Sequence, residues 1–344
     1  MSLRDFSELQ SSVVPTICRL FSLNRQTAGL FVDALNSTGD ECSPMLRATL
    51  LHSSRSRFAA HAASLERAES DRHGGYKQVY LQPKVVVCIT RPIKYATFRQ
   101  LLLELVIQSI MAERGYNVPH MRRAMVRVVG TPLVTLYQVI SQAERMQQTL
   151  AEYMASDAFG GLDEKERTNT MVVVLCSACE GVYRLHSELK IHHGDLKPDN
   201  MMRRCETAPT MRQWCLIDFG QARSGELGSD IFFLFWWLLH MYAKYLPRKL
   251  RAFVARSLCV PFEALRDVPF ASSVVAAPNG TVDFGKAVVR SSAALASAAP
   301  ADENWRKQFG LTKSELYALQ RTIAAPKLGP LAVNRALHKL YVRT

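Results

Sequence analysis

The stretch His192–Asn200 constrains this chain more than any other part of its sequence. It reads His-His-Gly-Asp-Leu-Lys-Pro-Asp-Asn, so an aspartate is followed by a lysine two residues later and by an asparagine five residues later. A second motif, Asp-Phe-Gly at Asp218–Gly220, begins eighteen residues after Asn200 and comes directly after the apolar Cys215–Ile217. Either motif alone could arise by chance. In this order and at this spacing, the two indicate a catalytic site to which both segments contribute.

The two motifs resemble the catalytic loop H-x-D-x-K-x-x-N and the D-F-G motif of eukaryotic-type protein kinases. The amino-acid sequences of Ile191–Asn200 and Leu216–Gln221 are also similar to those of the mitotic checkpoint Bub kinases. The resemblance implies an α+β, bilobal protein-kinase-like fold. A small five-stranded N-lobe would carry the αC helix, and a larger C-lobe would be helical. ATP and Mg²⁺ are the cofactors that the resemblance implies.

The same resemblance assigns roles to four residues of the two motifs. Asp195 would orient the substrate hydroxyl and act as the base, and Lys197 would neutralise charge on the transferred phosphoryl group. Asn200 and Asp218 would hold Mg²⁺, because amide and carboxylate oxygens suit this hard cation. Such roles agree with the general rule that phosphoryl transfer is catalysed by positioning and charge stabilisation.

The segment 72–81 is the second informative stretch. The glycine-rich loop of kinases, G-x-G-x-x-G-x-V, covers the nucleotide phosphates. With Val79 as the final valine, Gly74 takes the second glycine position, Tyr76 the aromatic tip and Lys77 the third glycine position. We expect Gly74, Gly75, Tyr76 and Val79 to contact the nucleotide. Because only one of the three glycines is kept, this motif is weak by itself.

The next strand, Lys84–Thr90, is continuous and β-branched. Kinases carry their phosphate-binding lysine on this strand, but the best register places Cys88 at that position, with Val86 also beside the nucleotide. Side chains alternate along a strand, so Lys77 and Val79 share one face. Lys77 is therefore predicted to point to the side where the phosphates would bind.

The combination of a lysine in the glycine loop and a cysteine in the third strand resembles the with-no-lysine kinases. The resemblance implies that Lys77 has taken over the catalytic role of the missing lysine. The alternative is an exposed loop lysine in a nucleotide-binding pseudokinase. Lys84 and Lys94 are weaker candidates, because one lies at the hairpin turn and the other lies beyond Pro92.

A strong amphipathic pattern predicts a helix over Thr97–Arg114. Glu104 is the only charged residue within Leu101–Ile107, and a carboxylate among leucines is costly unless it is paired. Glu104 occupies about the place of the αC glutamate of kinases, so we predict that it pairs with Lys77. The alternative is a partly exposed helix charge.

Further elements follow in the order that the resemblance implies. Two more strands, Ala124–Val129 and Pro132–Val139, would complete the sheet, and the hinge is predicted near Gln138–Ser141. A helix is expected over Ala143–Ala155, and Asn169–His186 is expected to form the helix that leads into the catalytic loop.

Two departures from the kinase pattern concern regulation and substrate. Gly194 stands where kinases usually have an arginine that binds an activation-loop phosphate. Asp230 is expected to begin the buried αF helix and to brace the catalytic loop, which leaves only residues 221–229 as an activation segment, without an Ala-Pro-Glu motif. The expected activity is that of a serine/threonine-type protein kinase. A pseudokinase scaffold and a small-molecule kinase are the alternatives.

The predicted organisation is an N-terminal helical extension over 1–70, a kinase N-lobe over 71–140 and a C-lobe over 141–344 with an Ala/Ser-rich insert near 272–301. The extension would contain helices over Ser12–Leu35 and Ser56–Ser70 and would pack on, or project from, the N-lobe. Trp305–Ala324 and Leu331–Tyr341 are expected to close the C-lobe as helices.

The composition of the chain indicates which kinds of partner it would bind and in which cellular compartment it would work. The formal net charge of +13 favours acidic partners: ATP, a protein substrate with an acidic surface, or nucleic acid, which stays open. Eight cysteines without a disulfide-like pattern indicate a reducing compartment. Cys176 and Cys179 are better explained by a buried helix face than by zinc. The apolar run Ile231–Leu239 is too short to cross a membrane, so we expect the cytoplasm or nucleus, of a host cell if the gene is viral.

Overall fold

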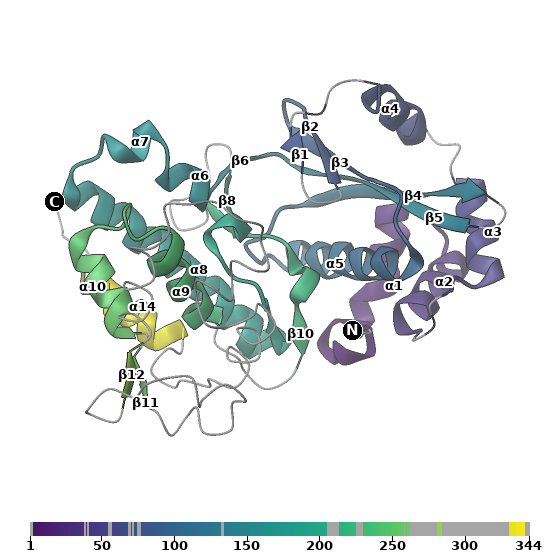
Figure 1. Cartoon of the computed structure of the whole chain (residues 1–344). Coiled ribbons are helices and arrows are strands. Elements are labelled where there is room, and N and C mark those ends of the chain that lie inside the picture. Colours follow the sequence, from purple (N-terminus) through teal and green to yellow (C-terminus); the bar gives the residue numbers. More distant parts are fainter. Residues whose placement is uncertain are drawn as a thin grey trace. The chain divides into compact units, whose positions relative to one another are not determined.

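The structure is a computed structural model, and it describes residues 3–340 except 38, 40, 54–56, 68–69, 71, 74–76, 132–133, 205–212, 225–229, 258, 262–280 and 284–329. The chain is mixed α/β with antiparallel sheets (Figure 1). It divides into two compact units. Unit 1 comprises Met1–Gln147, Arg204–Glu206 and Ile217–Ser224, and unit 2 comprises Gln148–Arg203, Thr207–Leu216 and Gly225–Thr344.

Unit 1 begins with short 3₁₀ turns and four helices. The predicted helix over Ser12–Leu35 is in fact two helices, because Ser22 adopts the left-handed conformation (φ 54°) and ends the first one. Asn24 then caps the second helix by accepting a hydrogen bond from the Thr27 amide. The 3₁₀ turns are η1 (Leu3–Asp5) and η2 (Ser7–Leu9), and the helices are α1 (Gln10–Phe21), α2 (Arg25–Asn36), α3 (Pro44–Ser53), which was not predicted, and α4 (Arg57–Leu65).

The N-terminal helices pack on unit 1 rather than projecting from it. Arg19 and Thr16 of α1 both bind the Glu113 carboxylate, through an ion pair of 2.6 Å and a hydrogen bond of 2.9 Å. Arg19 also donates to the Met121 carbonyl at 3.0 Å. Of the two arrangements that the sequence left open, the structure has the packed one.

A five-stranded antiparallel sheet forms the centre of unit 1, in the order β1-β2-β3-β5-β4. The hinge prediction at Gln138–Ser141 is wrong, because these residues lie within strand β5, where all four pair with β4 and Ile140 and Ser141 also pair with β3. Their mixed polar and apolar sequence resembles that of a connecting segment, although the backbone continues there as a β-strand. The strands are β1 (Arg72–His73), β2 (Lys77–Leu81), β3 (Val85–Thr90), β4 (Met121–Thr131) and β5 (Val134–Glu144).

Helices cover both faces of this sheet (Figure 1). On one face lies α5 (Tyr95–Glu113), in which every residue from Leu101 to Ala112 is buried, so it is the central helix of unit 1. On the other face α4 packs into a core cluster with strand residues: Phe58, Ala59, Ala62, Tyr80, Val87, Ile89, Met125 and Ile140.

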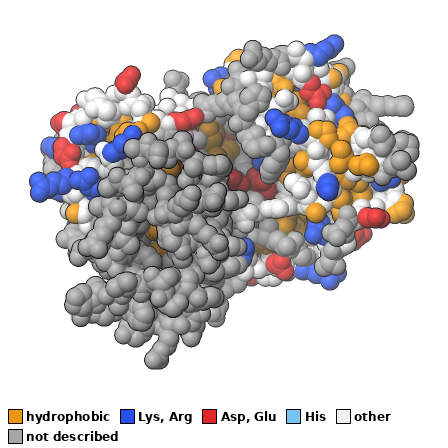
Figure 2. Space-filling model, viewed as in Figure 1, with side chains coloured by type: hydrophobic (Ala, Val, Ile, Leu, Met, Phe, Trp, Pro, Cys, Tyr) orange, Lys and Arg blue, Asp and Glu red, His pale blue; other side chains and the backbone are white. Residues whose placement is uncertain are grey.

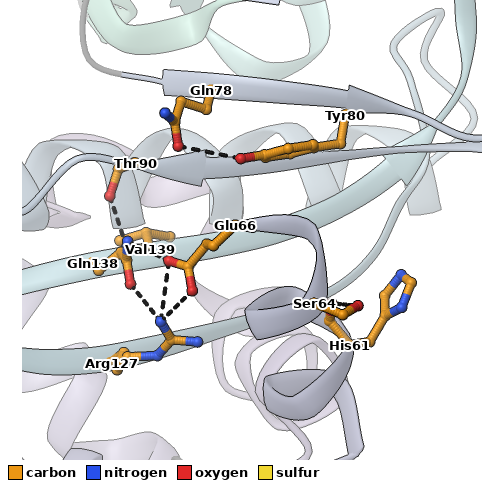
Figure 3. Close-up of polar contacts among 9 residues, drawn as sticks. All are labelled: His61, Ser64, Glu66, Gln78, Tyr80, Thr90, Arg127, Gln138 and Val139. Atoms are coloured by element: carbon orange, nitrogen blue, oxygen red, sulfur yellow. Dashed lines mark hydrogen bonds and ion pairs between the residues drawn. The ribbon is translucent and has the colours of Figure 1, made fainter. Parts of the chain in front are cut away.

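Polar contacts add to this apolar packing of α4. Glu66, just beyond the end of α4, binds Arg127 of β4 at 2.8 Å and accepts a hydrogen bond from Gln138 of β5 at 2.8 Å (Figure 3). Arg127 also donates to the Gln138 side chain at 2.9 Å. Glu66 therefore connects the C-terminal end of α4 to two strands of the sheet.

Unit 2 is mostly helical and is built around α8 (Glu164–Leu189). A capping box between Asp163 and Glu166 starts this helix, and Lys190 in the left-handed conformation ends it. Strongly apolar α9 follows later in the chain and is almost entirely buried. The other helices are α6 (Leu150–Met154), α7 (Asp157–Gly160), α9 (Asp230–Met241), α10 (Arg248–Ser257) and α14 (Pro330–His338), the last of which packs on α8.

The predicted helix over Ala143–Ala155 is only partly correct, because the first residues continue β5 and a further short strand precedes α6. Short elements complete the chain: β6 (Met146–Thr149), β7 (Ile191–His192), η3 (Pro198–Asn200), β8 (Met201–Arg204), β9 (Trp214–Leu216), η5 (Phe219–Gln221), β10 (Arg223–Ser224), β11 (Cys259–Pro261) and β12 (Thr281–Asp283).

Some predictions fall on residues that the structure does not describe. The predicted helix Trp305–Ala324 lies outside the described residues, and so does most of the Ala/Ser-rich segment 272–301. Cys176 and Cys179 are free and buried in α8, as the helical interpretation predicted. Within the described part of the chain, no helix has both the length and the apolar character that a membrane crossing needs.

Candidate active site

The predicted catalytic loop connects α8 to η3 and β8 in unit 2. Its apolar side chains anchor it, because Ile191, Leu196 and Met201 are fully buried. Pro198 begins the 3₁₀ turn η3, where its missing amide hydrogen and fixed φ are tolerated. Between these anchors the polar residues of the motif are held at fixed positions.

Asp230, the first residue of α9, holds the backbone of this loop. Its carboxylate accepts hydrogen bonds from the His193 amide at 2.9 Å and from the Gly194 amide at 3.0 Å. The His186 ring lies 2.9 Å from the same carboxylate. The predicted bracing of the loop by Asp230 is therefore confirmed.

The electrostatics of Asp230 agree with this arrangement. Burial by itself raises the pKa of the carboxyl group. The hydrogen bond from His186 and the neighbouring imidazoles outweigh burial and lower that pKa to about 2. Asp230 is thus an ionised, fully buried acceptor, with several donors that offset the cost of removing its charge from water.

Three predicted site residues meet on the loop. The Lys197 ammonium lies 2.6 Å from Oδ2 of Asp195, which is buried. Asn200 Nδ2 donates to the Asp195 carbonyl at 2.8 Å and to its Oδ2 at 3.3 Å. The structure thus brings Asp195, Lys197 and Asn200 together, with the aspartate held from two sides.

Two aromatic residues of unit 2 border this set, and neither was singled out from the sequence. The Lys197 ammonium lies 5.9 Å from the centre of the Trp237 ring, within the range of a cation–π contact. Tyr242 donates a hydrogen bond of 2.9 Å to Asp199. Both follow Asp230 in or just after α9, so this helix supports the loop at several points.

In unit 1 the strand register brings four predicted residues to one face of the sheet. Val79 lies opposite Cys88, and Val86 lies opposite Leu81 in the same antiparallel pair. Lys77 is two residues from Val79 and therefore shares its face. These four side chains are half-buried, whereas Tyr80, Val87 and Ile89 on the opposite face are buried in the core cluster with α4.

Lys77 and Glu104 form the ion pair that the sequence predicted, with 3.5 Å between Nζ and Oε1. Glu104 is 6% exposed, so the alternative of a partly exposed helix charge is wrong. Burial raises the pKa of Glu104, and the Lys77 charge counteracts this effect. A role of Lys77 in binding phosphate stays a prediction.

The predicted metal ligand Asp218 also belongs to unit 1. Its backbone is left-handed, with φ 64° and ψ 70°, which is uncommon for a residue with a side chain. Gly220 follows so closely that an added Cβ would lie 3.2 Å from Asp218 Oδ1 and 3.6 Å from Glu104 Oε2. Gln100 of α5 donates to the Gly220 carbonyl at 2.8 Å. The Asp-Phe-Gly turn is therefore packed against the helix that carries Glu104.

Gly74, Gly75 and Tyr76 lie outside the described residues, so their predicted contacts with nucleotide stay predictions. His186 is a residue that sequence reasoning missed. A buried histidine on the apolar side of α8 was the available signal, but its partner Asp230 is 44 residues away in sequence.

The charge of the chain is distributed over its surface. On the face drawn in Figure 2, the Lys and Arg side chains of the described residues are scattered and do not form a single patch. The expectation of an acidic partner stays a prediction.

Comparisons with known proteins find solved structures that are similar to this chain. The crystal structure of the BubR1 kinase domain matches with 18% sequence identity and a TM-score of 0.33. The match covers 53% of this chain and 61% of that chain, so this chain spans about three fifths of the domain. No protein-family model matches the sequence, and no curated protein matches it.

Proposed function

We propose that this chain is a protein-kinase-like phosphotransferase that uses ATP and Mg²⁺ to phosphorylate serine or threonine hydroxyls of a protein. The observation that carries the proposal is the hydrogen-bonded set of Asp195, Lys197 and Asn200, on a loop whose backbone Asp230 fixes. Phosphoryl transfer depends on such fixed charges, because its catalysis consists mainly of positioning and charge stabilisation.

In this proposal Asp195 orients the substrate hydroxyl and accepts its proton. The hydroxyl oxygen then forms a bond to the γ-phosphorus, while the bond from that phosphorus to the leaving oxygen of ADP breaks. Lys197, 2.6 Å from the Asp195 carboxylate, neutralises charge that develops on the transferred phosphoryl group. The short ion pair supports a shared position for base and cation.

Lys77 supplies the second cation by binding the α- and β-phosphates of ATP. Its ion pair with buried Glu104 supports this role, because the carboxylate fixes the direction of a flexible lysine side chain. Cys88 takes the place of the lysine that kinases usually carry on this strand. A half-buried face with Val79, Val86 and Cys88 suits the adenine and ribose.

The donor set fits Mg²⁺. Both side-chain hydrogen bonds that Asn200 makes among the described residues use its Nδ2, so Oδ1 can face a cation. Asp218 is exposed and offers carboxylate oxygens, which are ligands that Mg²⁺ prefers. When bound, Mg²⁺ would neutralise phosphate charge. The proposal requires that Asn200 and Asp218 act on one ATP molecule.

A second candidate is a kinase that acts on a small molecule. It is favoured by the short segment 221–229 between the Asp-Phe-Gly turn and α9, since an activation segment normally forms the platform for peptide substrates. A nucleotide-binding scaffold without activity is the third candidate. The complete set of Asp195, Lys197, Asn200 and Asp218 argues against it. We place the activity in the cytoplasm or nucleus.

Transfer of radiolabelled phosphate from ATP to a panel of proteins tests the proposal. We expect Asp195→Asn to lower the rate about 10²- to 10⁴-fold, because it removes the base. Lys77→Met should lower it about 10²- to 10³-fold through lost charge stabilisation, whereas Cys88→Ala should keep most of the activity. Lys84→Met, which removes an exposed lysine of the same region, is the matched control.

The outcomes separate the three candidates. Activity that survives Asp195→Asn or Asp218→Ala contradicts the proposed chemistry, and equal rates for wild type and Lys77→Met contradict the relocated lysine. Binding of ATP without transfer to any protein, to small hydroxyl compounds or to the chain itself favours the inactive scaffold. Transfer to small hydroxyl compounds alone favours the second candidate.

A further inference from the structure

A buried cluster of two histidines and one aspartate lies in unit 2 and contains none of the residues proposed to hold Mg²⁺. His186 comes from α8, His192 from β7 and Asp230 from the first turn of α9. One nitrogen or oxygen atom of each residue lies within 4.8 Å of the others, and all three residues are buried. The cluster therefore joins three elements at one point.

The geometry points to a metal site, and we propose that His186, His192 and Asp230 form a Zn²⁺ site that ties these three elements together. Two imidazoles and a carboxylate are donors that Zn²⁺ commonly takes from proteins. Mg²⁺ prefers oxygen ligands, so the same cluster would discriminate against the cation proposed for Asn200 and Asp218. A water molecule would complete a four-coordinate site.

The distances allow this coordination after small side-chain rotations. The His186 and Asp230 donor atoms are 2.9 Å apart, and the His186 and His192 ring centres are 4.6 Å apart. Zn²⁺ lies about 2 Å from nitrogen and oxygen ligands, so it needs ligand atoms roughly 3 to 4 Å apart. Metal binding would replace the direct contact between His186 Nε2 and the Asp230 carboxylate.

His192 supplies the third donor of the cluster. Asp230 already has a role through the His193 and Gly194 amides, and His186 is its hydrogen-bond partner. His192 adds a third ligand atom at 7% exposure, in a strand position between buried residues.

Metal content and metal affinity of the full chain test the site. The protein is stripped with a chelator, dialysed and titrated with Zn²⁺ in the presence of excess Mg²⁺. We expect one Zn²⁺ per chain and a higher melting temperature, because a ligand that binds only the folded chain stabilises it. Co²⁺ should replace Zn²⁺ and give the visible absorption of a low-coordinate site.

The variant His192→Leu shows whether the bound Zn²⁺ occupies this site or another part of the chain. Losing even a hydrogen-bond partner of a ligand costs about 10- to 100-fold in metal affinity, so losing a ligand should cost at least that. His120→Leu, at an exposed histidine of unit 1, should leave the affinity unchanged. If His192→Leu does not fold, His192→Gln provides the same comparison with a polar side chain.

Several outcomes would overturn the site: a wild type that binds no Zn²⁺ under these conditions, equal affinity in the wild type and the folded His192 variant, or displacement by Mg²⁺. None of these measurements uses phosphoryl transfer. Failure of the metal site and failure of the proposed activity are therefore distinguishable.

Discussion

Gly194 shows how one residue decides the geometry of the predicted catalytic loop. Its φ is +78°, in the left-handed region, and its amide donates to the Asp230 carboxylate at 3.0 Å. Side chains with a Cβ adopt this region only at a cost, because Cβ then approaches the following carbonyl oxygen. The glycine at this position thus has a backbone reason in this chain.

Gly194→Ala should destabilise the protein by about 1–2 kcal/mol, since alanine is strained at this φ. Chemical denaturation at neutral pH measures the effect. Gly29→Ala is the control, because Gly29 lies within α2 and its added Cβ would meet nothing within 4 Å. That substitution should gain up to about 1 kcal/mol. Equal stability of the Gly194→Ala variant and the wild type would contradict the proposed strain.

At the level of residues, the sequence predicted a contact only where the periodicity of a strand or helix shows which way a side chain points. The two-residue period of a strand placed Lys77 correctly, and the isolated charge of Glu104 among leucines identified its need for a partner. The contact of His186 with Asp230 could not be found in this way, because it joins two helices through the tertiary fold.

The element whose position could not be predicted is α4. Its apolar spacing predicted a helix over Ser56–Ser70, and the structure has Arg57–Leu65. An amphipathic pattern indicates that a face is buried but does not name what covers it. Only the structure assigns α4 to the outer face of the sheet, where Phe58 and Ala62 join the core cluster.

Phe58→Ala should destabilise the protein by about 3 kcal/mol or more, because it empties a buried position between α4 and the sheet. The same variant loses the stacking of the Arg123 guanidinium, 4.2 Å from the ring centre. Met45→Ala, at a side chain that is 66% exposed on α3, should change stability by less than about 0.5 kcal/mol. The free energies of unfolding of both variants in urea, compared with that of the wild type, test this prediction. A small effect at Phe58 would mean that α4 contributes little.

For the whole molecule, the two-unit organisation places the predicted site residues in two sets. Lys77, Glu104 and Asp218 belong to unit 1, whereas Asp195 and Asn200 belong to unit 2. Lys77 and Glu104 fall within the predicted N-lobe segment 71–140, whereas Asp218 falls within the predicted C-lobe segment 141–344. The strand boundaries were not predictable with the same precision, since β5 continues through residues whose polarity resembles that of a loop.

In the metal-free protein, Asp230 should make the stability of the molecule depend on acid pH. Its pKa is about 2 in the folded chain, below the ordinary 3.8, so its contribution is complete above about pH 4 and is lost as pH falls through 2. One pKa unit is worth about 1.4 kcal/mol, so about 2 kcal/mol is at stake. The measurement is the free energy of unfolding between pH 2 and 6.

Comparison with Asp230→Asn isolates this carboxylate from others that titrate in the same range. The variant should be less stable at pH 6, because the His193 and Gly194 amides then share a weaker acceptor. The difference between wild type and variant should shrink towards pH 2. A difference that stays constant with pH would show that the charge of Asp230 does not contribute.

The cover that α4 provides has a practical consequence for anyone who expresses this protein. A shortened version that starts at residue 71, where the kinase resemblance begins, would lack α4 and leave its strand partners bare. Tyr80, Val87, Ile89 and Ile140 would then form an exposed apolar surface on the fragment. Such a fragment would be expected to aggregate during purification, and its inactivity would say nothing about the chemistry of Asp195.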